Sequence, residues 1–509
     1  MRSVGRLQLG AFLAAMLAAC GTTPAGPAGS GSIDLDLELP PAGDLRPANM
    51  TTVAVAVTTL DGVENITTTP LTGMTFSAGD VLVGEPVLIG VELHDTTNRL
   101  VGFGRRDTTV TPDASDQTVK IDVRKPFVYV ASTGPVQTVD TTLDVLDPKY
   151  QGALAAAGTL AIPIDGTEMA VISGTKLQRV TTSDHKNTGT PLDLRAAVLD
   201  AASVPGKRQI VAATATMLVV FDIDAGSATT IPLTSPPDRV AIGGDAGAGF
   251  VAYVLSGRVA APQGAMATCT GSSTVTAVPL GGGASMTVST GAPLADIAAA
   301  GGAVFGANPC AGTVARLDGG SPKLQISLPG ASALAVEGVH LWAAGSSPSA
   351  TDGAQIVLAS VGLDGTDARM VRLAPKTEIM TFDGDPDQEF AIDLHADTEV
   401  ALDLAVLPGA QTVALIARMD SQRPPRVADD GFGGTVEVIP TMTAVVHDLV
   451  LADTKTGAVR RIRSKCALTV PANNTAEFRK WSCAKATGAE VPVGGEMIPS
   501  AVSALYGGR

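Results

Sequence analysis

The chain of 509 residues has few aromatic side chains, few charged ones and no long apolar run after its first 20 residues. Phe, Trp and Tyr make up 3% of it and Asp, Glu, Lys and Arg 17%. So few aromatic rings argue against a carbohydrate-binding platform, because sugars stack on exposed aromatic faces. A membrane-spanning helix needs about 20 consecutive apolar residues, and no segment after residue 20 approaches that length.

Positive charge is also scarce. Lys and Arg number 35 against 50 Asp and Glu, so the net charge is −15. Such a surface repels nucleic acid and anionic lipid headgroups, and we therefore expect neither as a partner.

The residues that are abundant favour strands. The chain has 56 Gly and 33 Pro, and 45% of it is hydrophobic. Long segments rich in Glu, Lys and Leu, which are typical of helices, are missing. Many short strands joined by tight turns are expected from this composition, and we predict an all-β protein.

The N-terminus has the features of an export signal. Arg2 and Arg6 precede an apolar run at 7–17 (LQLGAFLAAML), and 17–20 read LAAC. This arrangement resembles the lipobox of bacterial lipoproteins. The resemblance implies that residues 1–19 are removed as a signal peptide and that Cys20 carries the lipid anchor. The alternative is an ordinary signal peptide that contains a cysteine.

Gly21 bears on the choice of membrane. In the best-known sorting rule for such lipoproteins, Asp after the lipidated cysteine retains the protein in the inner membrane and Gly does not. We therefore expect the outer membrane, with the folded part facing the periplasm or the cell surface.

Two folded parts are expected after the cysteine. Residues 20–31 form the lipidated cysteine and a flexible tether (GTTPAGPAGSG from 21). Residues 32–124 alternate apolar and polar side chains, as in 32–39 (SIDLDLEL) and 119–123 (VKIDV), with a hairpin at 92–103. About seven such short strands resemble an immunoglobulin-like β-sandwich.

The remaining residues, 125–509, are repetitive. The segments 127–132 (FVYVAS) and 141–147 (TTLDVLD), and again 217–226 (MLVVFDIDAG) with 229–233, resemble the repeat of YVTN/lactonase-like β-propellers. Further inner strands are expected at 239–242, 294–297, 333–336 and 402–406, and second strands at 250–254, 303–305, 340–342 and 412–416. We predict roughly seven blades, with stacked sandwiches as the alternative.

The last strand has no blade of its own. Residues 500–506 (SAVSALY) are predicted to pair beside 127–132 and so close the ring, which removes its exposed sheet edges.

Besides Cys20 there are four cysteines, an even number in a chain expected to be exported. Cys269 and Cys310 each precede a Gly and a Ser/Thr-Val strand, so they occupy equivalent positions in adjacent blades. We predict one disulfide between them and a second between Cys466 and Cys483.

Three insertions break the repeat, at 381–399, 422–440 and 467–496. Because they interrupt neighbouring units, we expect them on one sector of the ring, where long loops on a rigid scaffold provide binding surfaces. Trp481 and Arg479, in the third insertion, are the candidate binding residues. The alternative is that the insertions are solvated loops without a binding role.

The first insertion contains the one segment with a metal-like spacing. Asp383, Asp385, Asp387 and Glu389 alternate and provide oxygens, which Ca²⁺ prefers. Pro386 and the missing loop Gly favour a plain acidic loop over a Ca²⁺ site, and no other cofactor is expected.

No catalytic residues are predicted, since the sequence has no nucleophile elbow, zinc-protease motif or phosphate loop. The pairs His447-Asp448 and Asp393-x-His395 are of a kind that occurs by chance. Asp296 and Asp403 are the inner-strand carboxylates, too few for a metal site in the channel.

The sequence therefore favours a lipid-anchored envelope protein without enzymatic activity, which presents a propeller face to a protein or another envelope component. The alternative is a lactonase-like hydrolase or lyase that acts in the central channel. The fold resemblance alone decides neither.

Overall fold

The computed structural model of the chain describes residues 30–504, except for positions 41–45, 60–63, 83–85, 110–116, 133, 143–151, 165–166, 183, 246–248, 261–268, 350–352, 383–391, 408, 410–411, 424–425, 430–433, 440–441, 470–480 and 484–500. All its regular elements are strands, which confirms the all-β prediction. Within these ranges there is no helix with the length and hydropathy to cross a membrane.

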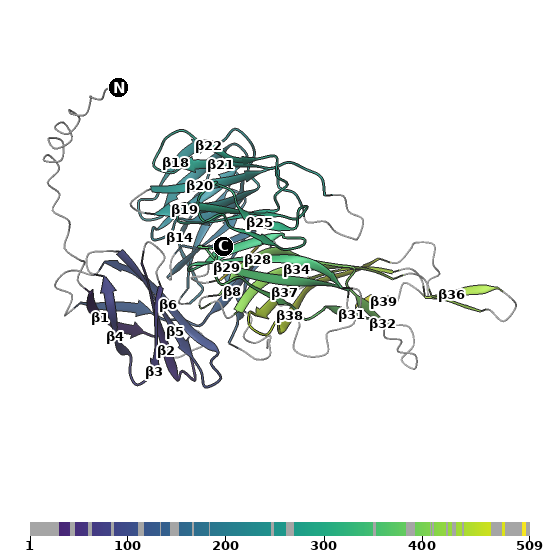
Figure 1. Cartoon of the computed structure of the whole chain (residues 1–509), viewed down its shortest axis with the longest axis horizontal. Coiled ribbons are helices and arrows are strands. Elements are labelled where there is room, and N and C mark those ends of the chain that lie inside the picture. Colours follow the sequence, from purple (N-terminus) through teal and green to yellow (C-terminus); the bar gives the residue numbers. More distant parts are fainter. Residues whose placement is uncertain are drawn as a thin grey trace, which may run out of the picture.

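The first seven strands form a sandwich of two sheets, in purple and blue in Figure 1. One sheet has the order β4-β1-β7, in which β1 and β7 are parallel, and the other has the order β3-β2-β5-β6. The bounds are β1 Ser30–Glu38, β2 Thr52–Thr59, β3 Glu64–Pro70, β4 Thr75–Leu82, β5 Pro86–His94, β6 Leu100–Thr109 and β7 Thr118–Asp122.

The apolar side chains of the alternating pattern fill the space between these two sheets. Ile33, Leu35 and Leu37 of β1 are buried against β2, β5 and β7, while Asp34 and Glu38 are exposed. The predicted hairpin at 92–103 is formed by β5 and β6. The structure thus contains a β-sandwich, and its assignment to the immunoglobulin-like class stays a prediction.

Seven four-stranded antiparallel sheets follow in the described residues and form a β-propeller. The strands of each blade are given from the innermost strand outward. Blade 1 has β40 (Ala501–Ala504), β8 (Phe127–Ala131), β9 (Pro135–Asp140) and β10 (Gly152–Ala157), and blade 2 has β11 (Leu160–Pro163), β12 (Glu168–Ser173), β13 (Lys176–Thr181) and β14 (Asn187–Asp193). Blade 3 has β15 (Val198–Ser203), β16 (Gln209–Thr214), β17 (Met217–Asp222) and β18 (Ser227–Pro232), and blade 4 has β19 (Arg239–Asp245), β20 (Gly249–Ser256), β21 (Thr274–Pro279) and β22 (Met286–Thr290).

Blades 5 to 7 continue this order. Blade 5 has β23 (Asp296–Ala300), β24 (Ala303–Asn308), β25 (Thr313–Arg316) and β26 (Gln325–Ser327), and blade 6 has β27 (Ala333–Glu337), β28 (His340–Ser349), β29 (Gly353–Gly362) and β30 (Arg369–Arg372). Blade 7 has β33 (Thr398–Val406), β34 (Thr412–Arg423), β37 (Met442–Asp453) and β38 (Val459–Thr469). Each innermost strand contacts the innermost strand of the next blade, and β40 contacts both β11 and β33, so the ring is closed.

The last strand closes blade 1 as predicted. Ala501 pairs with Ala131 and Ala504 with Val128, antiparallel. One repeat assignment needs correction. Residues 127–132 were expected to be an inner strand, but β40 takes that place and β8 is second. The segment at 217–233 forms the third and outer strands of blade 3. The four other inner strands and their second strands lie where the sequence predicts them.

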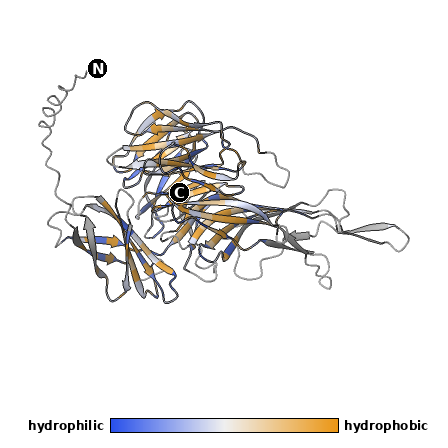
Figure 2. Ribbon diagram, viewed as in Figure 1, coloured by the Kyte–Doolittle hydropathy of each residue, from blue (hydrophilic) through white to orange (hydrophobic). Residues whose placement is uncertain are grey.

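Small aliphatic side chains fill the ring. The inner and second strands carry mostly buried Ala, Val, Ile and Leu, whereas an outer strand such as β18 is almost fully exposed. Figure 2 shows the hydrophobic colour concentrated on the strands of the ring. Seven tapering blades that interdigitate through Ala and Val need few aromatic rings, which accounts for the 3% in the composition.

The three insertions all leave blade 7 or its borders. The first forms β31 (Thr377–Phe382) and β32 (Ile392–His395), the second β35 (Arg426–Asp429) and β36 (Thr435–Ile439), and the third β39 (Trp481–Cys483). β31 pairs with both β32 and β39, so the first and third insertions share one sheet, as their expected convergence requires. Figure 1 shows β31, β32, β36 and β39 at the end of the molecule away from the sandwich.

Candidate functional site

The ring has two different faces. We call the face at which the innermost strands begin the upper face and the face at which they end the lower face. In an antiparallel blade, the connection between the second and third strands and the connection to the next blade both lie on the upper face. All three insertions occupy such connections, so they extend from the upper face.

A buried ion cluster occupies the channel near the upper face. Arg239, at the start of β19, lies among three carboxylates from other blades: its Nη2 is 3.2 Å from Asp403, its Nε 3.4 Å from Asp296 and its Nη1 3.8 Å from Asp200. All four residues are at most 8% exposed. The cluster thus ties together the inner strands of blades 3, 4, 5 and 7.

The carboxylates also join neighbouring blades through the backbone. Asp200 accepts a hydrogen bond from the N–H of Val240 at 2.8 Å, and Asp296 accepts one from the N–H of Leu334 at 2.9 Å. In each case a carboxylate on one innermost strand accepts a hydrogen bond from the backbone N–H of the second residue of the innermost strand in the next blade. The equivalent contacts show that these inner strands share one register along the channel.

The charges of this cluster shift one another's pKa. Burial raises the pKa of Asp296, although Arg239 and Arg258 oppose that rise. Burial acts to lower the pKa of Arg239, but the three carboxylates raise it above its usual range. Arg239 therefore stays charged, and the carboxylates that the sequence places in the channel neutralise it. Within the described part, no three His, Cys, Asp or Glu side chains are arranged to hold a metal ion.

A second ion cluster lies at the foot of the insertions. Lys376, just before β31, is 3.0 Å from Asp448, and Arg461 bonds Glu399 at 2.5 Å and lies 3.6 Å from Asp448. Glu399 is 0% exposed, so it belongs to blade 7 and not to the acidic insertion in which the sequence places it. Asp448, which the sequence pairs with His447, thus lies between Lys376 and Arg461.

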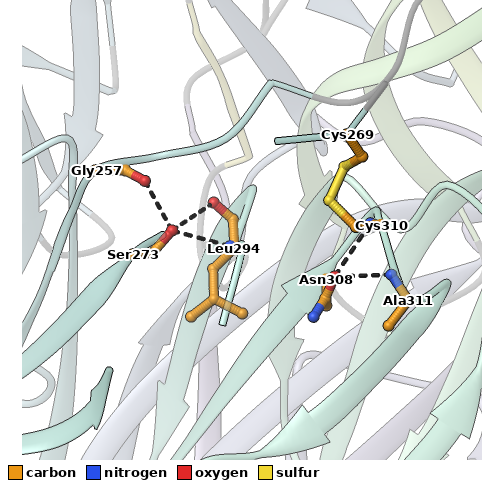
Figure 3. The surroundings of a disulfide bond; sticks show 7 residues. All are labelled: Gly257, Cys269, Ser273, Leu294, Asn308, Cys310 and Ala311. Atoms are coloured by element: carbon orange, nitrogen blue, oxygen red, sulfur yellow. Dashed lines mark hydrogen bonds between the residues drawn. A yellow bond between two sulfur atoms is a disulfide. The ribbon is translucent and has the colours of Figure 1, made fainter. Parts of the chain in front are cut away.

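The disulfide between Cys269 and Cys310 joins blades 4 and 5 at the upper face. Cys269 lies between β20 and β21 and Cys310 between β24 and β25, the same connection in each blade, and their Cα atoms are 5.3 Å apart. Figure 3 shows the surrounding polar contacts: the Asn308 side chain accepts the N–H of Cys310 at 3.0 Å, and Ser273 accepts the N–H of Leu294 at 2.9 Å.

The side chains of the other predicted site residues are not among those that the structure describes. Cys20, Arg479 and the acidic group Asp383, Asp385, Asp387 and Glu389 lie outside the described residues. Cys466, Cys483, Trp481, Asp393 and His395 lie on strands whose side chains at these positions are not described. The lipid anchor, the Ca²⁺ site and the second disulfide therefore stay predictions.

The lower face contains a cavity that the sequence did not indicate. It has a volume of about 810 Å³ and lies where the inner strands of blades 2 to 6 end. The sandwich covers it, and Arg105 of β6 reaches Glu337 of blade 6 at 3.4 Å. Arg99 also donates to the carbonyl of Thr142 in blade 1 at 3.0 Å. The sandwich is thus fixed to the lower face.

Comparisons with known proteins assign no family to the chain. No family model matches the chain, and no curated protein matches it. Among solved structures, U3-55K matches with a TM-score of 0.33 at 12% identity, over 56% of this chain and 86% of that one. The WD40 repeats of RRP9 match with a TM-score of 0.32 at 13% identity, over 56% and 84%.

A third match is the β-propeller domain of Cps50 (Swd1) from Myceliophteria thermophila, with a TM-score of 0.35 at 10% identity, over 59% of this chain and 95% of that one. At this level of similarity no function passes from these proteins to this chain. The propeller assignment rests on the seven sheets and their closure.

Proposed function

We propose that the protein is a lipoprotein, anchored in the outer membrane through Cys20, whose propeller binds another envelope protein through its upper face. The N-terminal sequence 17–20 (LAAC) supports the anchor, and Gly21 supports the outer membrane. The Cys269–Cys310 disulfide supports an oxidising compartment outside the cytosol. In this proposal the sandwich is an immunoglobulin-like spacer.

The observation that carries the proposal is the opposite placement of the sandwich and the insertions. The sandwich, which follows the tether, contacts the lower face through Arg105 and Arg99. The insertions leave the upper face at the far end of the molecule (Figure 1). A chain anchored at Cys20 therefore directs the upper face away from its own membrane.

In this proposal the tether lets the folded part of the protein move relative to the membrane. The tether predicted at 21–31 is shortened by β1, which begins at Ser30, and the remaining residues 21–29 contain Gly, Pro, Ala and Thr and no charge. A flexible coil of this length reaches roughly 16 Å. This lets the sandwich stand off the bilayer while the ring stays rigid, and a rigid scaffold with long loops on one face is a common arrangement for binding.

The channel favours binding over catalysis. A propeller enzyme of the lactonase-like kind would need carboxylates in the channel that are available to a metal or a substrate. Asp200, Asp296 and Asp403 instead surround Arg239, and Asp200 and Asp296 also bond the backbone of the next blade, so these carboxylates hold the ring together.

Cross-linking in intact cells tests the proposal. The protein, tagged at its C-terminus, is cross-linked and purified beside two variants: one with the hairpin region 424–441 replaced by a short Gly-Ser turn, and one with the turn 281–284 on the lower face replaced in the same way. We expect an envelope protein captured by the parent and by the 281–284 variant, and not by the 424–441 variant.

The anchor has its own control in the same experiment. Cys20→Ser removes the acceptor of the lipid, and we expect this variant to leave the membrane fraction and to lose the captured protein. Capture that survives both Cys20→Ser and replacement of 424–441 would contradict the proposal.

A further inference from the structure

The cavity between the sandwich and the ring lies at the face of the ring opposite to the one that we propose for protein binding. Its volume of about 810 Å³ is within the range of pockets that hold small molecules, about 300–1,000 Å³. It lies between the sandwich and the ring, and junctions between two such parts are a frequent location for ligands.

Its walls are mainly apolar. Ile162, Ile242, Ala300 and Val336 line it from four different blades, and Leu88 of the sandwich lines it from the other side. A molecule in this space would therefore bury a hydrocarbon or aromatic body.

The charged groups of the lining have a positive excess. Arg105, Arg106 and Arg208 face the cavity with Asp122 and Glu337, which makes three positive and two negative charges, or +1. The whole chain, by contrast, has a net charge of −15. Arg208 bonds Asp224 at 2.8 Å and Arg105 lies 3.4 Å from Glu337, so both already have a carboxylate partner, and Arg106 of the sandwich is the arginine of the lining that we assign to a bound anion. Guanidinium groups bind carboxylates and similar anions through paired N–H donors.

A buried hydroxyl is the second sign of a ligand. Ser503 of β40 is 4% exposed and lines the cavity, and its Oγ has no hydrogen-bond partner among the described residues. A buried polar group without a partner costs free energy, and in native proteins such a group usually has an explanation. A ligand with a polar atom supplies the missing partner.

We propose that this cavity is a binding site for a small organic anion with an apolar body. The body occupies the space between the inner-strand ends and Leu88, the anionic group lies toward Arg106, and Ser503 bonds a polar atom of the ligand. The site is independent of the lipid anchor and of the upper face, so it stands or falls separately from the function proposed above.

Calorimetric titration of the full chain with Cys20→Ser, which avoids attached lipid, tests this site. Three probes separate the two requirements: decanoate, decyltrimethylammonium (the same body with the opposite charge) and acetate (the same charge without the body). We expect decanoate to bind at least tenfold more tightly than either of the others. A fourth probe, 2-naphthoate, distinguishes an aromatic acid from a fatty acid as the natural source of this chemistry.

Variants locate the binding. Ala300→Phe fills the space at the end of β23 and should weaken decanoate at least tenfold, while Ala228→Phe, on the exposed outer strand β18, should leave it unchanged. Arg106→Gln should weaken decanoate about fivefold, with Arg369→Gln on the exposed β30 as its control. Arg106 and Arg369 are exposed, so these variants remain informative if Ala300→Phe fails to fold.

The hydroxyl provides a readout that a purely structural residue would not give. Ser503→Ala should weaken decanoate several-fold without lowering the melting temperature of the unliganded protein. Equal binding of decanoate and decyltrimethylammonium, no binding of either acid at millimolar concentration, or decanoate affinity unchanged by both Ala300→Phe and Arg106→Gln would overturn the proposal.

Discussion

Arg239 and Asp403 are 164 residues apart in the sequence, yet Nη2 of Arg239 donates to Oδ1 of Asp403 at 3.2 Å across the channel. The first belongs to blade 4 and the second to blade 7, so this bond spans a large part of the ring. Replacement of Arg239 by Met removes the cation and leaves three buried carboxylates beside one another. We expect a loss of about 3–5 kcal/mol in the free energy of unfolding at pH 7.5, measured by urea denaturation.

The same variant has a predicted pH dependence. Arg239 opposes the rise that burial causes in the pKa of Asp296, so without Arg239 this carboxylate binds a proton more readily and the deficit should shrink as the pH falls from 7.5 to 5. Arg369→Met, on the exposed outer strand β30, is the matched control and should change stability by less than about 0.5 kcal/mol. A deficit that is small, or that grows as the pH falls, would show that the cluster does not hold the ring together.

The Cys269–Cys310 disulfide should stabilise the folded protein because it closes a loop of the chain. Cys269 and Cys310 are 41 residues apart, a loop for which the chain-entropy account gives about 4 kcal/mol. The double variant Cys269→Ser/Cys310→Ser should therefore melt at a lower temperature than the parent, and a reductant should lower the melting temperature of the parent by more than that of the variant, which retains the predicted Cys466–Cys483 bridge. Equal melting temperatures for parent and variant under oxidising conditions would argue against the bridge.

Closure by the last strand should be essential to the ring. Removal of 500–509 leaves β8 as an unpaired sheet edge and takes out the innermost strand that lies between β33 and β11, and exposed edges promote association between chains. We expect a lower urea midpoint and aggregation in size-exclusion chromatography. Removal of 505–509 alone, which retains β40, is the control and should behave as the parent does. Equal behaviour of the two truncations would contradict the closure.

Asp453 should make part of the stability dependent on acid. It lies in the turn between β37 and β38 and accepts hydrogen bonds from the N–H groups of Lys455 at 2.9 Å and Thr456 at 2.7 Å. Burial acts to raise its pKa, but the bonds from Thr456 and Lys455 lower it below its usual 3.8. Its stabilising contribution is thus fully present above that value and is lost as the pH falls through the lowered pKa.

Urea midpoints between pH 6 and pH 2.5 check this prediction. Asp453→Asn should be less stable than the parent at pH 6 and should approach it at the acid end. A difference that stays constant across this range would mean that the carboxylate charge has no part in the turn.

The sequence predicts most of the ring because the blade repeat is local. The alternating segments at 239–242 and 402–406 lie on innermost strands, and 500–506 was assigned to blade 1 because an unpaired last strand leaves an open edge. The two cysteines were matched through the similar residues that follow each of them. In each case a few neighbouring residues carry the information.

The ion cluster was missed although its signal was present. Asp200, Arg239, Asp296 and Asp403 occupy the same position of their inner strands, and one Arg among three Asp at equivalent positions indicates a charge network. The cavity had no comparable signal, because Ser503 and Arg106 meet around it only once the sandwich is fixed to the lower face. The three insertions, by contrast, were found from the interruption of the repeat, and the alternating acidic residues of the first are the one pattern in them that suggests a ligand, Ca²⁺.

Photo-cross-linking in intact cells tests the orientation of the molecule most directly. A photoreactive residue is placed either at Ala260, exposed in the connection between β20 and β21 on the upper face, or at Ala225, exposed in the turn between β17 and β18 on the lower face. The account predicts a cross-linked envelope protein from position 260 and none from position 225. Products from position 225 alone, or equally from both positions, would contradict the proposal that the upper face is the binding surface.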